Sequence, residues 1–239
     1  MTRNPKWSRD ELILALDLYM RVNPVHTSDT NPEIIKLSEI LNSLPIHPNK
    51  DQSEKFRNAN GVYMKLCNFL RLDPNYKGSG LQRGGKLEEV IWNEFSQDQK
   101  RLSSIAAAIR KGSQYVSPPT DEVDVASEEE EEFPEGRVLT QLHKRRERNP
   151  KVVQKKKKMV LEETGSLSCE VCRFDFFFVY GKLGYGFAEC HHRKPLSELI
   201  ESKTTNVGDL AIVCANCHRM LHRARPWKTI DELRKLLQR

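Results

Sequence analysis

Two Cys-x-x-Cys pairs give this sequence its clearest chemical signature. They are Cys169 with Cys172, and Cys214 with Cys217. Two such pairs commonly supply the four thiolates of a tetrahedral zinc site. Four protein ligands leave no position for substrate, so we predict a structural zinc ion. A redox role is the main alternative, and the presence of two pairs argues against it.

Four histidines lie between and after these pairs: His191, His192, His218 and His222. His218 and His222 are four residues apart, which puts both imidazoles on one face of a helix and suits a shared metal or phosphate. A lone histidine is most often structural. Here His191 and His192 are adjacent, and His218 and His222 are one helical turn apart beside a Cys-x-x-Cys pair, which we call a cysteine knuckle. This grouping predicts a second site.

The segments carrying these histidines read ECHHRKPL at 189–196 and CANCHRMLH at 214–222. They resemble the HNH, or ββα-metal, endonucleases, and among them the McrA-like restriction endonucleases, over roughly the last third of the chain. The resemblance implies a β-hairpin and a helix that hold one divalent cation, Mg²⁺, Mn²⁺ or another. It also implies that His192 is the general base, that His191 and His218 ligate this catalytic metal, and that His222 is a further ligand or a phosphate contact.

The middle residue of the HNH name is normally an asparagine that fixes the backbone of the general base. Here Asp209 aligns with it, a departure from the pattern, and Asn206 ranks second. An aspartate can accept a hydrogen bond from backbone N–H but cannot donate one as asparagine does.

Hydrolysis of a phosphodiester needs a deprotonated water and a place for negative charge to collect. A histidine titrates near neutral pH and can take the proton, while a divalent cation stabilises the phosphate and the departing 3′ oxygen. Arg193, Lys194 and Arg219 are candidates for contacting phosphate. The alternative is that any of them is simply solvated.

Bulk composition is compatible with a polyanionic partner. The 239 residues carry a formal net charge of +6, and the pI is about 9.0. The sequence shows no apolar run of membrane-spanning length and no secretory signal at its start, so we expect a cytoplasmic protein without a membrane partner. The length suits two compact units.

The region 1–111 reads as a mostly helical domain. Ser8 to Glu11 forms a capping box, and Asn31 followed by Pro32 predicts a second helix start. A third helix holds the apolar positions around Val62 to Leu70. We predict a single fourth helix running from about Gly85 toward Ile109.

The composition changes twice after this region. Residues 112–137 are rich in Ser, Pro, Asp and Glu, including the run Glu128–Glu132, and predict a disordered acidic linker. A basic helical lead-in follows at 138–163, and it suits phosphate contact slightly better than a merely solvated face. The zinc-stapled nuclease domain would occupy 164–239. The expected fold class is α+β.

Residues Arg57, Asn58, Asn60 and Arg83 suggest a DNA-reading surface on the front domain, because Arg and Asn can contact base edges or phosphates. The alternative is that such residues are helix caps and packing positions. The arrangement is similar to that in modification-dependent restriction enzymes.

The expected function is therefore cleavage of double-stranded DNA, most simply in restriction of foreign or modified DNA. One HNH module cuts one strand, so double-strand cleavage favours a homodimer, and a nickase is an alternative. The rival from another class is a zinc-stabilised DNA-binding module without catalysis.

Overall fold

The computed structural model describes residues 4–47, 55–78, 84–116, 136–147, 149–194, 206–223 and 228–237, with only the backbone for 143–147. The chain forms two compact units that divide within helix α6, between Leu139 and Thr140. We call them the front unit and the rear unit, and each is described by itself.

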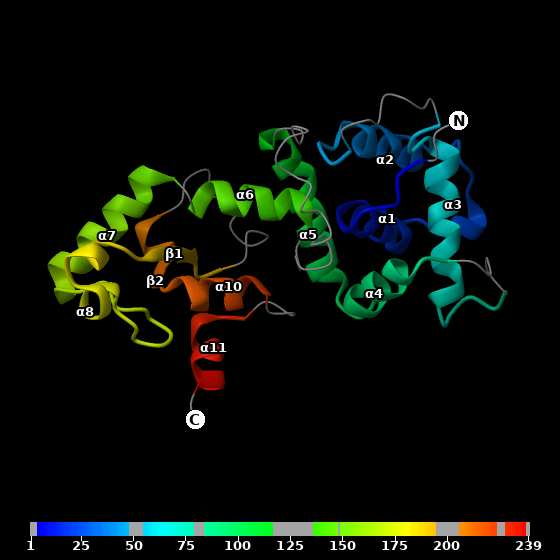
Figure 1. Cartoon of the computed structure of the whole chain (residues 1–239). Coiled ribbons are helices and arrows are strands. Elements are labelled where there is room, and N and C mark those ends of the chain that lie inside the picture. Colours follow the sequence, from blue (N-terminus) through cyan, green and yellow to red (C-terminus); the bar gives the residue numbers. More distant parts are fainter. Residues whose placement is uncertain are drawn as a thin grey trace. The chain divides into compact units, whose positions relative to one another are not determined.

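Helices build the front unit (Figure 1). They are α1 (Arg9–Arg21), α2 (Pro32–Ser43), α3 (Ala59–Phe69), α4 (Lys86–Phe95), α5 (Gln99–Gly112) and the first turn of α6 (Arg137–Glu147), with 3-10 turns at Pro24–His26, Leu70–Leu72 and Ser113–Tyr115.

The capping signals in the sequence mark the first two helices correctly. Ser8 accepts from the backbone N–H of Glu11, and the Glu11 carboxylate accepts from the N–H of Ser8 at 2.7 Å. Asn31 caps α2 by accepting from the N–H of Glu33, with Pro32 in the first helical position. Both predicted helix starts are confirmed.

The prediction of a single helix from Gly85 toward Ile109 is wrong. Helix α4 ends at Phe95, and α5 begins at Gln99. Asp98 lies between them, and its carboxylate accepts from the N–H of Arg101 at 3.0 Å. This N-cap starts a new helix, which an apolar pattern read across the break does not reveal.

Helix α1 is the centre of the front unit, because every residue from Arg9 to Tyr19 is buried. Its polar side chains are therefore paired. Arg9 binds Glu94 on α4 at 2.5 Å, and Asp17 binds Arg110 on α5 at 2.7 Å. Partners from surrounding helices satisfy these charges, as burial requires.

The rear unit combines helices with a two-stranded sheet. Its further elements are α7 (Pro150–Thr164), α8 (Phe176–Tyr180), a 3-10 turn (Gly181–Gly184), β1 (Glu189–His192), a 3-10 turn (Val207–Asp209), β2 (Leu210–Val213), α10 (Ala215–Arg223) and α11 (Ile230–Leu237). The strands are antiparallel, and His191 pairs with Ala211 and His192 with Leu210.

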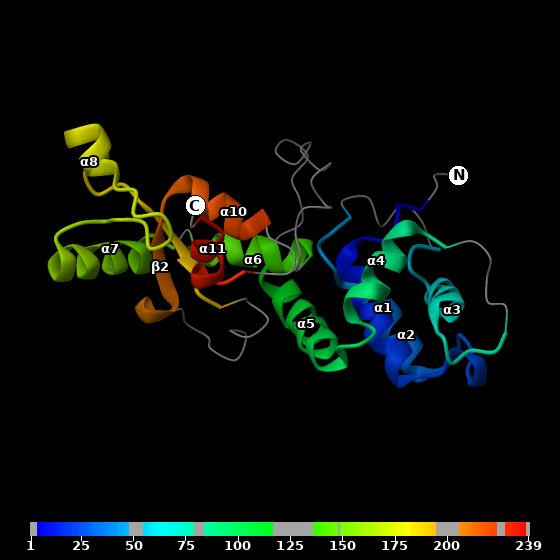
Figure 2. The same cartoon turned by 90° about the horizontal axis from the view of Figure 1, so that it is seen from below.

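The hairpin formed by β1 and β2 lies between α7 on one side and α10 with α11 on the other (Figures 1 and 2). A small core lies on each of its faces. On one face, Ala211 and Val213 pack with the cysteines and with apolar residues of α10 and α11. On the other face, Leu210 and Ile212 pack with Leu167 and α7. The hairpin is therefore fixed on both sides.

Most of the expected acidic linker, residues 117–135, lies outside the described residues. The chain before it remains helical through Tyr115, beyond the expected start at 112. The basic lead-in contains two helices, α6 and α7, with Asn149 capping the second. None of the described helices combines the length and apolar character needed to cross a membrane.

Candidate metal centres and nuclease site

The four knuckle cysteines converge at one point. The sulfur atoms of Cys169, Cys172, Cys214 and Cys217 all lie within 4.8 Å of one another, and none is in a disulfide. The sulfurs of Cys172 and Cys214 are 3.6 Å apart. Four sulfurs at about 2.3 Å from one zinc ion would be separated by about 3.8 Å. The donor set therefore fits a tetrahedral zinc site.

The surroundings of Cys169 shift its pKa in the opposite direction from those of Cys172 and Cys217. Burial raises the pKa of Cys172 and of Cys217, because the charged form is disfavoured away from water. Burial also acts to raise the pKa of Cys169, but backbone N–H groups hydrogen-bonded to its sulfur outweigh this and lower the pKa. A zinc ion would supply the positive charge that the remaining thiolates need.

Glu170 ties the first knuckle to the sheet. Its backbone N–H donates to the carbonyl of Ile212 at 2.9 Å, and its carboxylate accepts from the N–H of Ile212 at 2.9 Å. Arg234 of α11 donates to the carbonyl of Glu170 at 2.7 Å. The knuckle is thus held by β2 and by the C-terminal helix.

Three histidines form a second cluster. The hairpin contributes His191, and α10 contributes His218 and His222, one helical turn apart. Their candidate ligand nitrogens all lie within 4.8 Å of one another, and the Nε2 atoms of His218 and His222 are 3.0 Å apart. Two nitrogens at about 2.1 Å from one ion would be separated by about 3.0–3.4 Å. This donor set also fits a divalent cation.

Glu189 is a site residue to which the sequence analysis gave no role. Its carboxylate lies 2.5 Å from Nδ1 of His218, which leaves the Nε2 of that ring for a metal. Glu189 and His191 are two residues apart on β1 and therefore share a face of the strand. This alternation of side chains along β1 is the sequence signal that could have pointed to Glu189 as a site residue. A carboxylate in this position fixes the orientation of a ligating imidazole.

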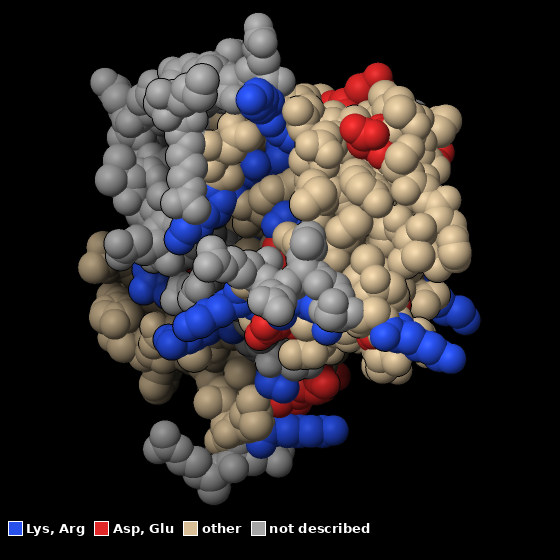
Figure 3. Space-filling model, turned by 90° about the vertical axis from the view of Figure 1, so that its right-hand side faces the viewer, with Lys and Arg blue, Asp and Glu red and all other residues tan. Residues whose placement is uncertain are grey.

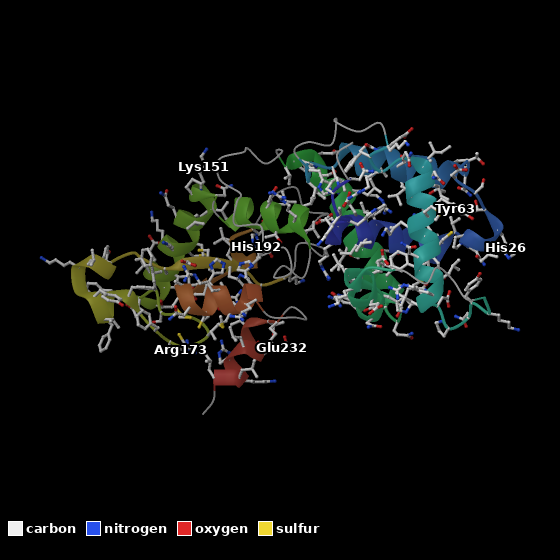
Figure 4. The ribbon with its side chains drawn as sticks, turned by 45° about the vertical axis from the view of Figure 1, so that its right-hand side comes forward. His26, Tyr63, Lys151, Arg173, His192 and Glu232 are labelled. Carbon is white, nitrogen blue, oxygen red and sulfur yellow. The ribbon has the colours of Figure 1, made fainter. Side chains whose placement is uncertain are left out.

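His192 is placed differently from the other three histidines. His192, labelled in Figure 4, is the last residue of β1. Strand alternation puts its side chain on the face opposite to His191. Its exposed fraction is 0%. The metal-binding group consists of His191, His218 and His222. The role of His192 as general base stays a prediction.

Asp209 closes the hairpin. Its backbone carbonyl accepts from the N–H of Arg193 at 2.8 Å, one residue beyond His192. Its carboxylate accepts from the N–H of Asn206 at 3.1 Å, capping the 3-10 turn that leads into β2. These contacts link Asp209 to the end of β1 through its main chain, and a direct side-chain role toward His192 stays a prediction.

The basic side chains around the site differ in availability. Lys194 and Arg219 are exposed. Arg193 binds Glu170 at 2.6 Å, with 40% of its side chain exposed. All three can reach solvent, but Arg193 would have to leave or share its carboxylate partner to contact a phosphate.

Arg57, expected to contact DNA, is instead built into the front unit. Its exposed fraction is 3%, and its guanidinium donates to Glu11 at 2.6 Å and to the carbonyls of Pro5 and Lys6. The guanidinium also lies over the ring of Trp7, 4.6 Å from its centroid. In this position the guanidinium is fully engaged within the front unit, and the role of Arg57 as a DNA contact stays a prediction.

The other front-unit residues predicted to contact DNA differ in their surroundings. Asn58 caps α3 by accepting from the N–H of Gly61 at 2.8 Å, whereas Asn60 is exposed. Arg83 lies outside the described residues. On the face shown in Figure 3, Lys and Arg side chains form separate groups beside a broad uncharged area.

Comparison with known proteins identifies one family. Residues 169–224 match the family model described as HNH endonuclease. This segment contains the four cysteines, the histidine cluster and Glu189. No curated protein and no solved structure matches the chain. The rear unit thus carries an HNH endonuclease domain, which indicates a nuclease that acts on DNA, and the front unit lies outside the match.

Proposed function

We propose that this chain is a divalent-metal-dependent endonuclease that hydrolyses phosphodiester bonds in double-stranded DNA, and that it acts in restriction of foreign or modified DNA. The observation that supports catalysis most directly is the convergence of His191, His218 and His222, with Glu189 orienting His218. A DNA-binding module stabilised only by its zinc site would need no second group of metal ligands.

His191, His218 and His222 would hold the catalytic cation, with Mg²⁺ or Mn²⁺ as the first candidates. A bound divalent cation would stabilise negative charge on the phosphate and on the departing 3′ oxygen. Glu189 keeps the Nδ1 edge of His218 engaged, so that its other nitrogen faces His222. The cysteine knuckle fixes the start of α10, which carries two of the three histidines.

His192 would take the proton from the attacking water. A general base must come within hydrogen-bonding distance of that proton, and catalytic contacts often form only in the substrate complex. Since His192 is fully buried here, its action requires the end of β1 to become accessible to water when DNA binds. Exposed Lys194 and Arg219 would contact the backbone phosphates.

Plasmid cleavage tests this assignment. The wild-type chain should cut supercoiled plasmid with Mg²⁺ or Mn²⁺ and fail to cut with EDTA. His218→Ala and His192→Ala should each lower the cleavage rate on the order of 100- to 10,000-fold, with the fold and DNA binding retained. His26→Ala removes an exposed histidine of the front unit and is the matched control. Near-normal cutting by His192→Ala would remove the general-base assignment.

The complete burial of His192 is the observation that favours a DNA-binding module without catalysis. That alternative predicts retarded DNA on a gel but no cleavage with any divalent metal. The same plasmid assay separates a nickase, which yields only open circles, from an enzyme that linearises the plasmid.

We further propose that the front unit selects the substrate. Asn60 is the expected contact that remains described and exposed. Asn60→Ala in the full chain should reduce preference among unmodified and modified duplexes while leaving the cleavage rate on non-specific plasmid unchanged. An unchanged preference would turn attention to other front-unit residues or to a partner-binding role.

A further inference from the structure

An unusually apolar segment lies between the first knuckle and β1. We call residues 174–187 the aromatic hairpin; it contains α8 and the following 3-10 turn and lies at one end of the rear unit (Figures 1 and 2). Phe178 is 90% exposed, Leu183 87% and Tyr185 70%. Four more apolar side chains are exposed by half or more: Phe177, Val179, Tyr180 and Phe187.

The scaffold beneath these exposed side chains is ordered. The Phe176 ring packs against Phe174 and Phe187, with centroid distances of 4.9 Å and 4.7 Å. Gly184 lies so close that a Cβ there would be 2.0 Å from the carbonyl oxygen of Phe176. Lys157 of α7 donates to the carbonyl of Gly186 at 3.1 Å. These contacts hold the aromatic hairpin together, and the half-exposed rings of Tyr180 and Phe187 also pack against Phe176.

The size of the exposed patch suits a protein interface. A fully exposed aromatic side chain offers about 150–250 Å². Seven apolar side chains exposed by half or more therefore exceed the patch of about 300–600 Å² found on typical monomers. They approach the share of one partner in a standard interface, about 800 Å².

The low charge of the patch distinguishes between a nucleic acid and a protein as its partner. The aromatic hairpin contains one acidic residue, Asp175, and one basic residue, Lys182. Asp175 is already used to cap α8, where it accepts from the N–H of Phe178 at 3.0 Å. Protein–DNA interfaces are strongly positive, whereas protein interface cores are depleted of charge and enriched in Phe and Tyr. The composition therefore favours a protein with an equally apolar surface.

A groove beside α8 gives the patch a shape that can receive its own protrusions. The groove has a volume of about 930 Å³. Its apolar lining is Phe174, Phe177, Phe178 and Val179, and its polar or charged lining is Ser166, Ser168, Cys172, Arg173 and Asp175. Leu183 and Tyr185 do not line it. A surface that carries both a groove and a neighbouring apolar protrusion can pair with its own copy about a two-fold axis, each protrusion entering the other groove.

We propose that the aromatic hairpin is the interface of a homodimer, in which Leu183 and Tyr185 of each copy pack against the groove beside α8 of its partner. A dimer would bring two HNH domains into one particle. That consequence, cleavage of both strands by one assembly, rests on the proposed nuclease function. The self-association itself does not depend on it.

The test measures the mass of the full-length, zinc-loaded chain in the absence of DNA. Light scattering after size exclusion, and sedimentation velocity, should give a dimer at micromolar concentration. A double variant, Phe178→Glu with Leu183→Glu, should be monomeric, with a dissociation constant raised by at least about 30-fold. Leu236→Glu is the matched control, because Leu236 is 65% exposed on α11 of the same unit.

Each outcome decides the proposal. Loss of the dimer in the double variant alone, with unchanged zinc content and circular dichroism, supports it. A wild-type chain that is monomeric at 100 µM, a concentration on the order of the dissociation constants of weak physiological interfaces, overturns it. A dimer that survives both substitutions also overturns it, since the interface must then lie elsewhere. Association that disappears only on nuclease treatment would identify nucleic acid as the occupant instead.

Cleavage products separate this proposal from the proposed function. If both hold, the monomeric double variant should still nick plasmid but should linearise it more slowly, by at least about 10-fold at equal nicking rate, as weakened dimerisation predicts. If the chain has no nuclease activity, the mass measurements still test the dimer. If the monomeric double variant linearises plasmid as fast as the wild type, the nuclease assignment stands and the dimer is not needed for double-strand cleavage, while the mass measurements still decide the interface.

Discussion

The front and rear units bury their polar groups in different ways. In the front unit, the buried carboxylates are satisfied by protein partners, as Glu11 is by Arg57 and Asp17 by Arg110. In the rear unit, the four thiols and three imidazoles face one another in two groups of like chemistry. Each group gathers metal-binding atoms of one kind, so both groups have the donor chemistry to hold a cation.

The size of the cores follows the same division. The front unit surrounds helix α1, which is buried from Arg9 to Tyr19, whereas the rear unit has two small cores on either side of a two-stranded sheet. Small domains bury too little apolar surface to be stable alone and often require a metal. The comparison therefore predicts that the two units respond differently to metal removal, to loss of an ion pair and to pH.

The largest expected difference is in metal dependence. Cys169→Ser or Cys214→Ser should unfold the rear unit, because structural zinc commonly contributes about 10–16 kcal/mol to the folding of small domains. Zinc analysis should find about one tightly bound ion per wild-type chain at this site. Cys67→Ser, in the front unit, should retain the zinc. Soluble and active protein without zinc would contradict the prediction.

The second difference concerns Arg57. Arg57→Ala should destabilise the front unit by about 3–5 kcal/mol, because it leaves Glu11 buried without its strongest partner. Denaturant unfolding monitored by circular dichroism measures this, and Lys86→Ala, at an exposed position of α4, should change stability little. Unchanged stability together with lost DNA binding would contradict this prediction and support a role of Arg57 as a DNA contact.

A smaller effect is expected at Glu189. Glu189→Gln should weaken binding of the catalytic cation by about 10- to 100-fold, because the amide orients His218 less strongly than the carboxylate. Calorimetric titration of zinc-loaded protein with Mn²⁺ gives this affinity independently of cleavage. Glu162→Gln, an exposed carboxylate on α7, serves as the control. Equal Mn²⁺ affinity in both variants would mean that Glu189 does not position the ligand.

The smallest expected effect is a pH dependence confined to the front unit. Burial raises the pKa of Asp10 to about 6, although its carboxylate accepts from the N–H groups of Arg137 and Val138. The folded state then binds a proton that the unfolded chain releases, so this contribution to stability is lost as pH rises through 6. Stability should increase by about 1 kcal/mol from pH 7 to pH 5.

The comparison for this effect is Asp10→Asn, which removes the titrating group. The difference between wild type and variant in free energy of unfolding should change across this interval. Below the ordinary pKa range of glutamate, the stability of wild type and variant alike should fall, because the His47 and Arg57 contacts lower the pKa of Glu11 despite its burial. A difference that is constant from pH 7 to pH 5 would exclude Asp10 as its source.

Local signals in the sequence predicted much of this protein. The capping residues Ser8 and Asn31 mark helix starts because a cap acts within its own turn. The Cys-x-x-Cys spacing and the His218–His222 spacing predicted residues that the structure brings together, because residues so close in sequence share a turn. His191 was expected as a ligand only from the family resemblance. The break at Asp98 was missed because an apolar pattern can continue across the junction of two helices.

Other properties depended on contacts between distant segments. Arg57 and Asn58 are neighbours in a polar segment that is compatible with DNA contact, but Glu11 and Gly61 determine what each side chain does. Glu189 acquires a role only because the hairpin packs on α10, and His192 is buried on the opposite face of the same strand. Sequence thus determined the donor chemistry, whereas tertiary structure decided which donors converge, because convergence depends on packing between segments far apart in the chain.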